Sequence, residues 1–516
     1  MRRSSSRRFA QAVAALGVAA VGIAGCAGAT VGTGPATSFA SPGERLDALV
    51  AEPPFDRVHW GVLAVDALSG EPVYELNPDL LFIPASNMKL PVTVAALGLL
   101  GPDYRWETTF FARSLPVDGR LDGDLYLPAV GDPTLGEPFH PSGEDALRAA
   151  VDSLLHAGAG EISGRLVVDA SAWDSTSVPE SWMVEDLHVT AGATGGAFAV
   201  DRGVLEIRIR GAARAGEPAT AEWTPHGRDA GEPSPFVVSR VVTAPAGETA
   251  DLVTSYRPES RRWLVEGHVG TGQELTLRRA ARDPVRLAVS TLERVLADRG
   301  IRSGDGAEIL WERAVPLGRR CESGRIASCA EMLRVAGVPS APLHEVVAAI
   351  LGPSQNWMAE QLVRTLGQEK GTRGSWAEGF RVMGEHLERV AGIGPEDVNW
   401  EDGSGLSNHN LISPRALVSL LRHAGREPWG ELFRAGLAQP GVEGTTLASR
   451  LGGLEGRVFA KTGSLSHVNA LSGYLVTSGG REIVFAILTN GANVPAREVR
   501  GQIDALVGAL AAGSTR

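Results

Sequence analysis

The chain has 516 residues with 49 basic and 60 acidic side chains, a formal net charge of −11, and 43% hydrophobic residues. This composition predicts a soluble globular protein of about two to four domains. The acidic balance argues against nucleic acid as a partner, because proteins that bind a polyanion carry a basic surface.

The first 26 residues are predicted to be an export signal. Residues 1–10 carry four arginines and no acid, and an apolar stretch rich in Ala, Val and Gly follows. This stretch is shorter than the roughly 20 residues that span a bilayer. It ends in Ile23-Ala24-Gly25-Cys26, which resembles a bacterial lipobox with Cys26 as the acylated residue. The alternative is a plain signal peptide with an incidental cysteine.

We therefore expect residues 1–26 to be a lipoprotein signal peptide and residues 27–43, rich in Gly, Ala, Thr, Ser and Pro, to be a flexible tether. The mature protein would be exported and anchored to a membrane of the cell envelope, on its periplasmic or outer surface. Beyond Cys26 the chain has only Cys321 and Cys329. Their proximity in an exported chain favours a disulfide, with two separate buried thiols as the alternative.

Residues 44–105 are predicted to form the first part of an α/β domain. Residues 59–76 indicate two strands joined by the turn Leu68-Ser69-Gly70. An apolar helix then begins near Ser86 and ends before Gly101-Pro102. Lys89 falls one turn after Ser86 on the same helix face, so the two side chains can meet.

Residues 106–315 read as a β-rich insertion of one or two domains, because short alternating runs are separated by Gly, Pro and Asp. Residues 316–516 would complete the α/β domain. Helical patterns return at 343–366, 376–391 and 414–423. A strand leading into Lys461, a hairpin over 470–490 and a last helix over 497–511 follow.

Lysine usage points to the chemistry, because the chain has only Lys89, Lys370 and Lys461. Two of them lie in the short motifs Ser86-Asn87-Met88-Lys89 and Lys461-Thr462-Gly463. Arginine can supply a positive charge but cannot be deprotonated, whereas a desolvated or crowded lysine can act as a base. This usage predicts a serine acyltransferase with lysine in place of histidine.

Three motifs occur in the order known from penicillin-binding proteins and class A β-lactamases: Ser86-x-x-Lys89, Ser354-Gln355-Asn356 and Lys461-Thr462-Gly463. The chain is most similar to the D-alanyl-D-alanine carboxypeptidase/endopeptidase family, the low-molecular-mass class C penicillin-binding proteins. Other segments that resemble this family are 123–127, 131–135, 356–360, 402–407, 444–447 and 471–474. Gln355 stands where the family more often has Asp, and residues 190–203 match loosely.

The resemblance implies an α/β multidomain protein: a transpeptidase-like domain with an antiparallel sheet flanked by helices, interrupted by the β-rich insertion. It implies a serine-type D-Ala-D-Ala carboxypeptidase, in part a DD-endopeptidase, that cleaves peptidoglycan peptides through an acyl-enzyme on Ser86. Penicillins and other β-lactams would acylate the same serine as inhibitors. No cofactor and no metal are implied.

Each candidate residue has an expected role. Lys89 would be the general base, and Lys461 the second cation that lowers the pKa of Lys89 and attracts the substrate carboxylate. By resemblance, Ser354 relays the proton to the leaving D-alanine and Asn356 orients Lys89 and the substrate amide. Thr462, Gly463 and Ser464 would complete the carboxylate pocket. The resemblance also implies that the backbone N–H groups of Ser86 and Ser464 form the oxyanion hole.

Three alternatives remain open at this point. A β-lactamase would share the three motifs, although the long interruption argues against it. An esterase of the same superfold would need no cation for a terminal carboxylate. A cell-wall binding module without activity is the alternative that is not an enzyme. Asp402 and Ser404 are expected to shape a loop beside the site, because Asp402 departs from the Gly-x-Ser-x-Gly pattern of a hydrolase elbow.

Overall fold

The computed structural model describes residues 42–193, 195–224, 227–228, 235–312 and 332–513. Cys26, Cys321 and Cys329 lie outside these residues, and with them the predicted lipid anchor and disulfide. Among the described residues, no helix has both the length and the apolar character that crossing a membrane requires.

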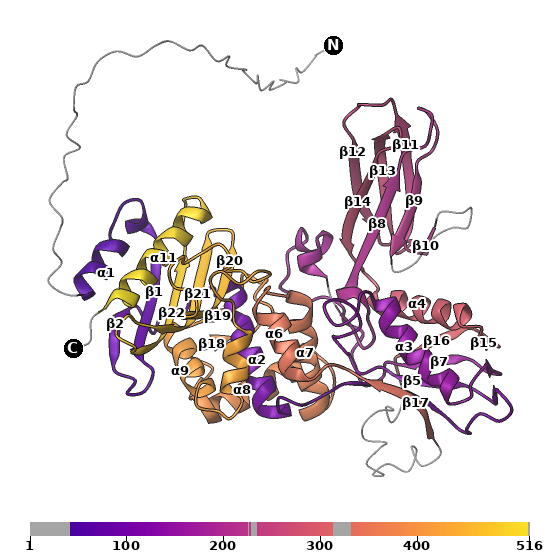
Figure 1. Cartoon of the computed structure of the whole chain (residues 1–516), viewed down its shortest axis with the longest axis horizontal. Coiled ribbons are helices and arrows are strands. Elements are labelled where there is room, and N and C mark those ends of the chain that lie inside the picture. The colour runs from indigo at the N-terminus through magenta and orange to yellow at the C-terminus, as the bar shows by residue number, and fades with distance from the viewer. Residues whose placement is uncertain (1–41, 194, 225–226, 229–234, 313–331, 514–516) are drawn as a thin grey trace, which may run out of the picture. The chain divides into compact units, whose positions relative to one another are not determined.

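A five-stranded antiparallel sheet is the framework of the α/β domain, with strand order β2-β1-β22-β21-β20 (Figure 1). β1, near the start of the domain in sequence, pairs directly with β22, near its end, from His59 opposite Asn490 to Asp66 opposite Ile483. Helices cover both faces, so β21 and β22 are buried almost throughout, and β22 contains the continuous apolar run 483–488. The strands are β1 His59–Asp66, β2 Pro72–Leu76, β20 Val458–Leu465, β21 Val468–Val476 and β22 Glu482–Asn490.

One face of the sheet packs against α1 and α11, and the other against a cluster built around α2. Every residue of α2 from Lys89 to Leu97 is buried, as expected for a helix that is apolar on all sides. The helices are α1 Pro42–Val50, α2 Lys89–Leu100, α6 Leu343–Leu351, α7 Asn356–Lys370, α8 Trp376–Ala391, α9 Pro414–Ala424, α10 Gly430–Gly436 and α11 Ala496–Ala512; β18 Val398–Asn399 and β19 Leu411–Ile412 form a short separate pair.

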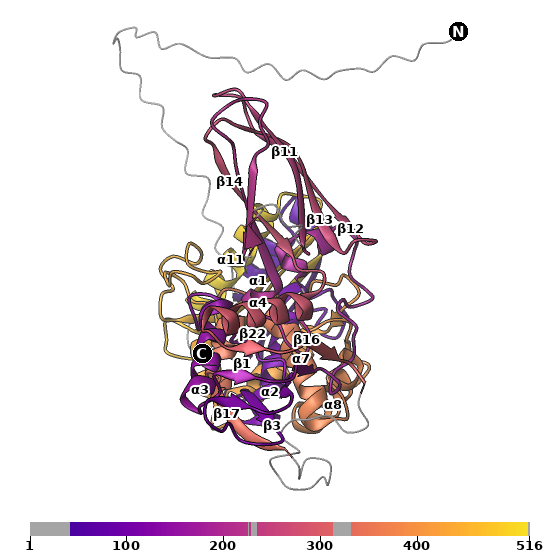
Figure 2. The ribbon, with the colours of Figure 1, turned by 90° about the vertical axis from the view of Figure 1, so that its right-hand side faces the viewer.

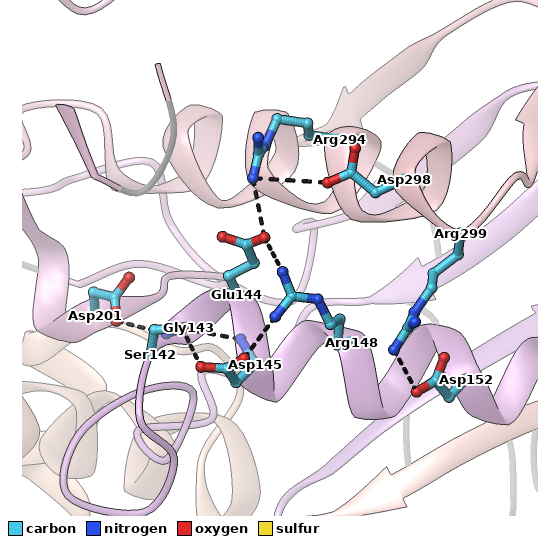
Figure 3. Close-up of polar contacts among 10 residues, drawn as sticks. All are labelled: Ser142, Gly143, Glu144, Asp145, Arg148, Asp152, Asp201, Arg294, Asp298 and Arg299. Atoms are coloured by element: carbon cyan, nitrogen blue, oxygen red, sulfur yellow. Dashed lines mark hydrogen bonds and ion pairs between the residues drawn. The ribbon is translucent and has the colours of Figure 1, made fainter. Parts of the chain in front are cut away.

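The first part of the insertion is a mixed sheet of order β16-β7-β5-β3-β17 that shares a core with two helices, α3 and α4. Glu144 of α3 joins them, since it binds both Arg148 of its own helix and Arg294 of α4, and Asp152 pairs with Arg299 at 2.9 Å (Figure 3). The bounds are β3 Glu107–Ala112, β4 Arg120–Leu121, β5 Leu125–Pro128, α3 Gly143–His156, β6 Glu161–Ile162, β7 Leu166–Asp169, α4 Pro284–Asp298, β15 Arg302–Ser303, β16 Ala307–Leu310 and β17 Leu333–Pro339.

The second part of the insertion is a small β-sandwich. Its sheets have the orders β10-β9-β8-β14 and β11-β13-β12, and their strands are seen side by side in Figures 1 and 2. A separate apolar cluster that includes Ile207, Trp223 and Trp263 lies between them. The strands are β8 Val204–Arg210, β9 Thr220–Thr224, β10 Gly227–Arg228, β11 Val237–Ala244, β12 Asp251–Arg257, β13 Arg262–Gly270 and β14 Glu274–Ala280.

Most predicted elements are present, with two informative differences. The single helix predicted over 343–366 is wrong: α6 ends at Leu351 and α7 begins at Asn356. Gly352-Pro353 breaks the helix, because proline lacks the N–H that a helical hydrogen bond requires and its ring clashes with the carbonyl group four residues before it. The predicted β-rich segment 106–315 also contains α3 and α4, and β17, which lies beyond it in sequence, pairs with β3.

Candidate active site

Ser86 lies in a strained turn at the start of the buried helix. A short 3₁₀ helix, η2 (Ala85–Met88), leads into α2, and Ala85 has a left-handed φ of 47° that is costly for a residue with a side chain. Gly405 closes on this turn, since a Cβ there would lie 1.8 Å from the Ala85 carbonyl oxygen. Ser86 itself is partly exposed, so a substrate can reach its hydroxyl.

Lys89 is fully buried and contacts three oxygens. Its Nζ lies 2.8 Å from Ser86 Oγ, 2.8 Å from Asn356 Oδ1 and 2.5 Å from the Ser404 carbonyl oxygen. The amide and carbonyl oxygens can only accept hydrogen bonds. A neutral amine has two N–H groups for these two acceptors, which leaves its lone pair directed at the Ser86 hydroxyl.

Burial lowers the pKa of Lys89 to about 7, although the negative charges of Asp402 and Glu360 act in the opposite direction. The predicted cause was different, since we expected Lys461 to lower the pKa of Lys89. Instead, burial is the main cause for both lysines, and repulsion from Lys89 further lowers the pKa of Lys461. A neutral Lys89 is therefore accessible near neutral pH.

The break between α6 and α7 places the second motif. Ser354 has a φ of 67°, and its Oγ accepts a hydrogen bond of 2.8 Å from Lys461 Nζ, which also donates to the Thr462 carbonyl oxygen at 2.8 Å. Asn356 is the first residue of α7, and its Nδ2 donates to the carbonyl oxygen of Ala191 in the insertion. The side chain that holds Lys89 is thus itself held by the insertion.

The third motif lies on the edge strand β20. A Cβ on Gly463 would lie 2.6 Å from the Pro84 carbonyl oxygen, so glycine lets this strand approach the turn that carries Ser86. Thr462 Oγ1 donates to Thr446 Oγ1 at 2.7 Å, and the exposed Ser464 Oγ lies 3.4 Å from Asn469 Oδ1. The structure brings all the predicted site residues together except Cys26, which lies outside the described residues.

Two buried carboxyl groups, those of Glu360 and Asp402, hold the loop 402–407 against Lys89. The sequence analysis expected Asp402 to shape this loop but missed the part of Glu360. Glu360 accepts hydrogen bonds from the backbone N–H of Gly403 at 2.9 Å and of Ser404 at 2.8 Å, and from Trp376 Nε1 at 2.7 Å. Asp402 accepts from the backbone N–H of Gly405 and Ser407, and from the side chains of Asn410 and Trp182.

These bonds aim the Ser404 carbonyl at Lys89, and the two carboxyl groups face two lysines in the same buried region. Burial and repulsion from Asp402 raise the pKa of Glu360 to about 7. The sequence signals were that both residues lie in segments that resemble the family and that Asp402 was expected to shape a loop beside the site. Their proximity to Lys89 required the fold.

A cavity of about 490 Å³ opens beside the second motif. Pro353, Ser354, Gln355 and Asn356 line one side, and residues of the insertion line the other, among them Glu137, Ala191 and Arg202. The insertion therefore forms part of the wall next to the catalytic residues, and it provides room for groups larger than a terminal D-alanine.

Comparisons with known proteins agree with this geometry. Residues 43–512 match the model of the D-Ala-D-Ala carboxypeptidase 3 (S13) family. A D-alanyl-D-alanine carboxypeptidase from Actinomadura sp. (strain R39) is 33% identical over 471 residues, which cover 88% of this chain and 81% of that protein. D-alanyl-D-alanine carboxypeptidase DacB from Haemophilus influenzae is 24% identical, with 84% and 85% covered.

Solved structures show the same fold. Penicillin binding protein 4 (dacB) from Haemophilus influenzae superposes with a TM-score of 0.73 at 23% identity, covering 90% of this chain and 98% of that one. The same protein complexed with a β-lactam superposes with a TM-score of 0.69 at 22% identity, over the same shares of the two chains.

Proposed function

The chain belongs to the D-Ala-D-Ala carboxypeptidase 3 (S13) family, and we propose that Ser86 is the nucleophile of this activity, with Lys89 as its base. The protein is a serine-type D-Ala-D-Ala carboxypeptidase that acts on peptidoglycan peptides. The observation that carries the assignment is the 2.8 Å contact between Lys89 Nζ and Ser86 Oγ, with the other two contacts of the amine made to obligate acceptors.

In the acylation step, neutral Lys89 takes the Ser86 proton while Oγ forms a bond to the carbonyl carbon of the penultimate D-alanine. The oxyanion is held by the backbone N–H groups of Ser86 and Ser464, and such a donor contributes about 3 to 4 kcal/mol. The C–N bond then breaks. Ser354 passes a proton to the leaving nitrogen, a role supported by its hydrogen bond to Lys461. Water next cleaves the ester on Ser86.

The terminal carboxylate of the substrate is assigned to Lys461, Thr462 and Ser464. Two ammonium groups in one buried region repel each other, so Lys89 and Lys461 disfavour carrying charge together. A carboxylate that arrives beside Lys461 favours its charged form, and the repulsion then favours neutral Lys89. Substrate binding therefore helps to keep the base in its active state.

The test is Ser86→Ala, with release of D-alanine from a peptide ending in D-Ala-D-Ala and labelling by a fluorescent penicillin as the two measurements. Both should fall by more than about a thousandfold, because no acyl-enzyme can form. Ser69→Ala, in the exposed turn between β1 and β2, is the matched control. Residual covalent labelling of the Ser86 variant would place the nucleophile elsewhere.

The same acyl transfer would cleave a peptidoglycan cross-link, where the leaving amine belongs to a second stem peptide. The 490 Å³ cavity beside Ser354 supports this DD-endopeptidase activity, because it offers space beyond a terminal D-alanine. Purified cross-linked muropeptide dimers should therefore be converted to monomers by the wild type. Release of D-alanine without any loss of dimers would refute the endopeptidase assignment.

We also propose that the protein is exported and anchored through acylated Cys26, on the strength of the signal-like residues 1–26. The wild type should partition into detergent, and Cys26→Ala should not. A chain that begins at Ser41 should retain full activity, since it keeps every described helix and strand. Freely soluble, unmodified wild-type protein would leave an ordinary signal peptide as the explanation.

A further inference from the structure

A second cavity, of about 330 Å³, lies within the insertion and shares none of its lining residues with the catalytic site. Five separate stretches meet there: the segment after β7, Gly195-Gly196, the end of β12 with the turn to β13, the start of α4 and the residue after β16. The lining residues on which the argument rests are Ser175, Thr176, Ser177, Tyr256, Arg282 and Trp311. Its volume is that of a small-ligand site.

Among the residues that the structure describes, Arg282 is a half-buried cation without a counter-ion. Within the described residues its guanidinium has only a long hydrogen bond of 3.4 Å to the Leu187 carbonyl oxygen and a contact with the Tyr256 ring, 5.8 Å from the centroid. Burial lowers the pKa of this guanidinium, which reflects the loss of water around it. A desolvated cation gains most from an anion that replaces the lost water.

The acids at this cavity are already engaged. Asp174 binds the fully buried Arg364 at 2.7 Å, and Asp283 accepts from the Arg286 backbone N–H and lies 3.5 Å from Arg261. Two arginines and two aspartates line the cavity, and Arg364 of α7 reaches its edge to pair with Asp174, so Arg282 is left without a carboxylate partner among the described residues. The excess positive charge is local to this cavity, and an acidic group is the ligand that it attracts.

The uncharged groups of the cavity suit a sugar. Tyr256 and Trp311 supply aromatic surface for the apolar C–H face of a sugar ring, while Ser175, Thr176 and Ser177 bring three hydroxyls for its polar edge. These hydroxyls make no hydrogen bond to another described residue. A carboxylate alone would need only the arginine, so the mixture of groups favours a saccharide that carries an acidic group.

Residues around the cavity contact α7, the helix that begins with Asn356. Arg364 of α7 lies between the rings of Trp173 and Trp376, 4.7 and 4.6 Å from their centroids, and it binds Asp174 at the edge of the cavity. Gly195, another lining residue, packs so closely on Gln361 of α7 that a Cβ would lie 2.0 Å from Oε1. A ligand held in the cavity thus has a defined position relative to the catalytic helix.

We propose that this cavity binds an anionic saccharide of the cell wall and so holds the enzyme on its polymeric substrate. The proposal relies on the proposed function only for the identity of the polymer. Two sources share the chemistry: glycan strands whose carboxylates are free because their peptides have been removed, and sugar polymers linked by phosphodiesters. Both present a sugar ring with an acidic group to Arg282.

The test is calorimetric binding of the full chain to three probes: peptide-free glycan strands, a phosphodiester-linked wall polymer and neutral chitotetraose. The wild type should bind at least one anionic probe about tenfold more tightly than chitotetraose, and Arg282→Gln should abolish this preference. The anionic probe that binds identifies the source. Hydrolysis of a short soluble peptide should be unchanged in the variant.

Arg279→Gln is the matched control, because Arg279 is a half-buried neighbour that donates to Thr254 Oγ1 and does not line the cavity. If Arg282→Gln fails to fold, the double change Thr176→Ala and Ser177→Ala, at hydroxyls without structural bonds, should weaken binding severalfold. No preference for anionic probes in the wild type, or wild-type binding by the cavity variants, would overturn the proposal. If the wild type binds the anionic probe but releases no D-alanine from a peptide, the proposed function is refuted and the saccharide site is still supported.

Discussion

The lysines of the active site and the arginines of the β-sandwich carry the same formal charge in opposite environments. Lys89 and Lys461 are 0% exposed, and each is held by hydrogen bonds of 2.5 to 2.8 Å. Arg210 and Arg278 are 65% exposed and pair with glutamates of neighbouring strands. Burial makes the proton of a lysine removable, whereas water keeps the sandwich arginines charged and their ion pairs weak.

The largest effect should come from removing the base while keeping the charge. Lys89→Arg should reduce the rate of penicillin acylation by about a hundredfold to ten thousandfold, nearly as much as Lys89→Ala, because a guanidinium cannot accept the serine proton. The control is Lys370→Arg at the exposed end of α7, which should behave like the wild type. Wild-type acylation by Lys89→Arg would refute the role of Lys89 as base.

The next effect tests the carboxyl groups that surround this base. Glu360→Gln replaces an acceptor oxygen with an NH₂ group, so one backbone N–H of the Gly403–Ser404 segment loses its partner and the Ser404 carbonyl is less well aimed. Acylation should slow by about tenfold to a hundredfold. Glu385→Gln, on the exposed side of α8, is the control.

The same variant should change the pH profile. Acylation requires neutral Lys89, so its rate rises with pH through the pKa of this lysine, about 7. Above its own raised pKa, Glu360 carries a negative charge that raises the pKa of Lys89. The Gln variant lacks this charge, so the acidic limb should move to lower pH; Asp402, Lys461 and Arg364 are the other charges nearby. A slower enzyme with an unshifted limb would show that Glu360 only stabilises the fold.

Lys461→Arg should have a smaller effect than Lys89→Arg, because attraction of the substrate carboxylate needs a positive charge and not a removable proton. The loss should lie mainly in KM, by about tenfold, as the larger guanidinium displaces the carboxylate. The measurement is steady-state hydrolysis of a peptide ending in D-Ala-D-Ala. A loss as large as that of Lys89→Arg would assign proton transfer to Lys461 as well.

The smallest effect should come from the sandwich. Arg210→Gln breaks an exposed pair with Glu274 and should leave both activity and the Tm unchanged within error, at low and at physiological salt, because water and ions screen such pairs. Differential scanning calorimetry in the two buffers is the measurement. A clear drop in Tm would mean that surface pairs contribute to this fold and that the contrast with the active site is one of degree.

The local sequence pattern was sufficient to predict part of this structure. Periodicity predicted the β1–β2 pair, the buried helix after Ser86 and the terminal hairpin, because these elements depend on residues that are close in sequence. Motif order alone brought together Ser86, Lys89, Ser354, Asn356 and Lys461 as candidates. The position of Lys89 relative to Ser86 follows from helix geometry alone, because the two residues are three apart in one helix.

Tertiary structure decided the rest, because the remaining contacts join residues that are far apart in the chain. The break between α6 and α7 had a local signal in Gly352-Pro353, which the helical interpretation of 343–366 overlooked, but only the fold shows that this break turns Ser354 toward Lys461. Glu360 and the loop at Asp402 meet beside Lys89 only when α7 and α2 pack together, and this burial, which no local pattern encodes, lowers the pKa of the lysine. Likewise, Arg282 acquires its environment only where five separate stretches of the insertion converge, since desolvation depends on everything that surrounds a side chain.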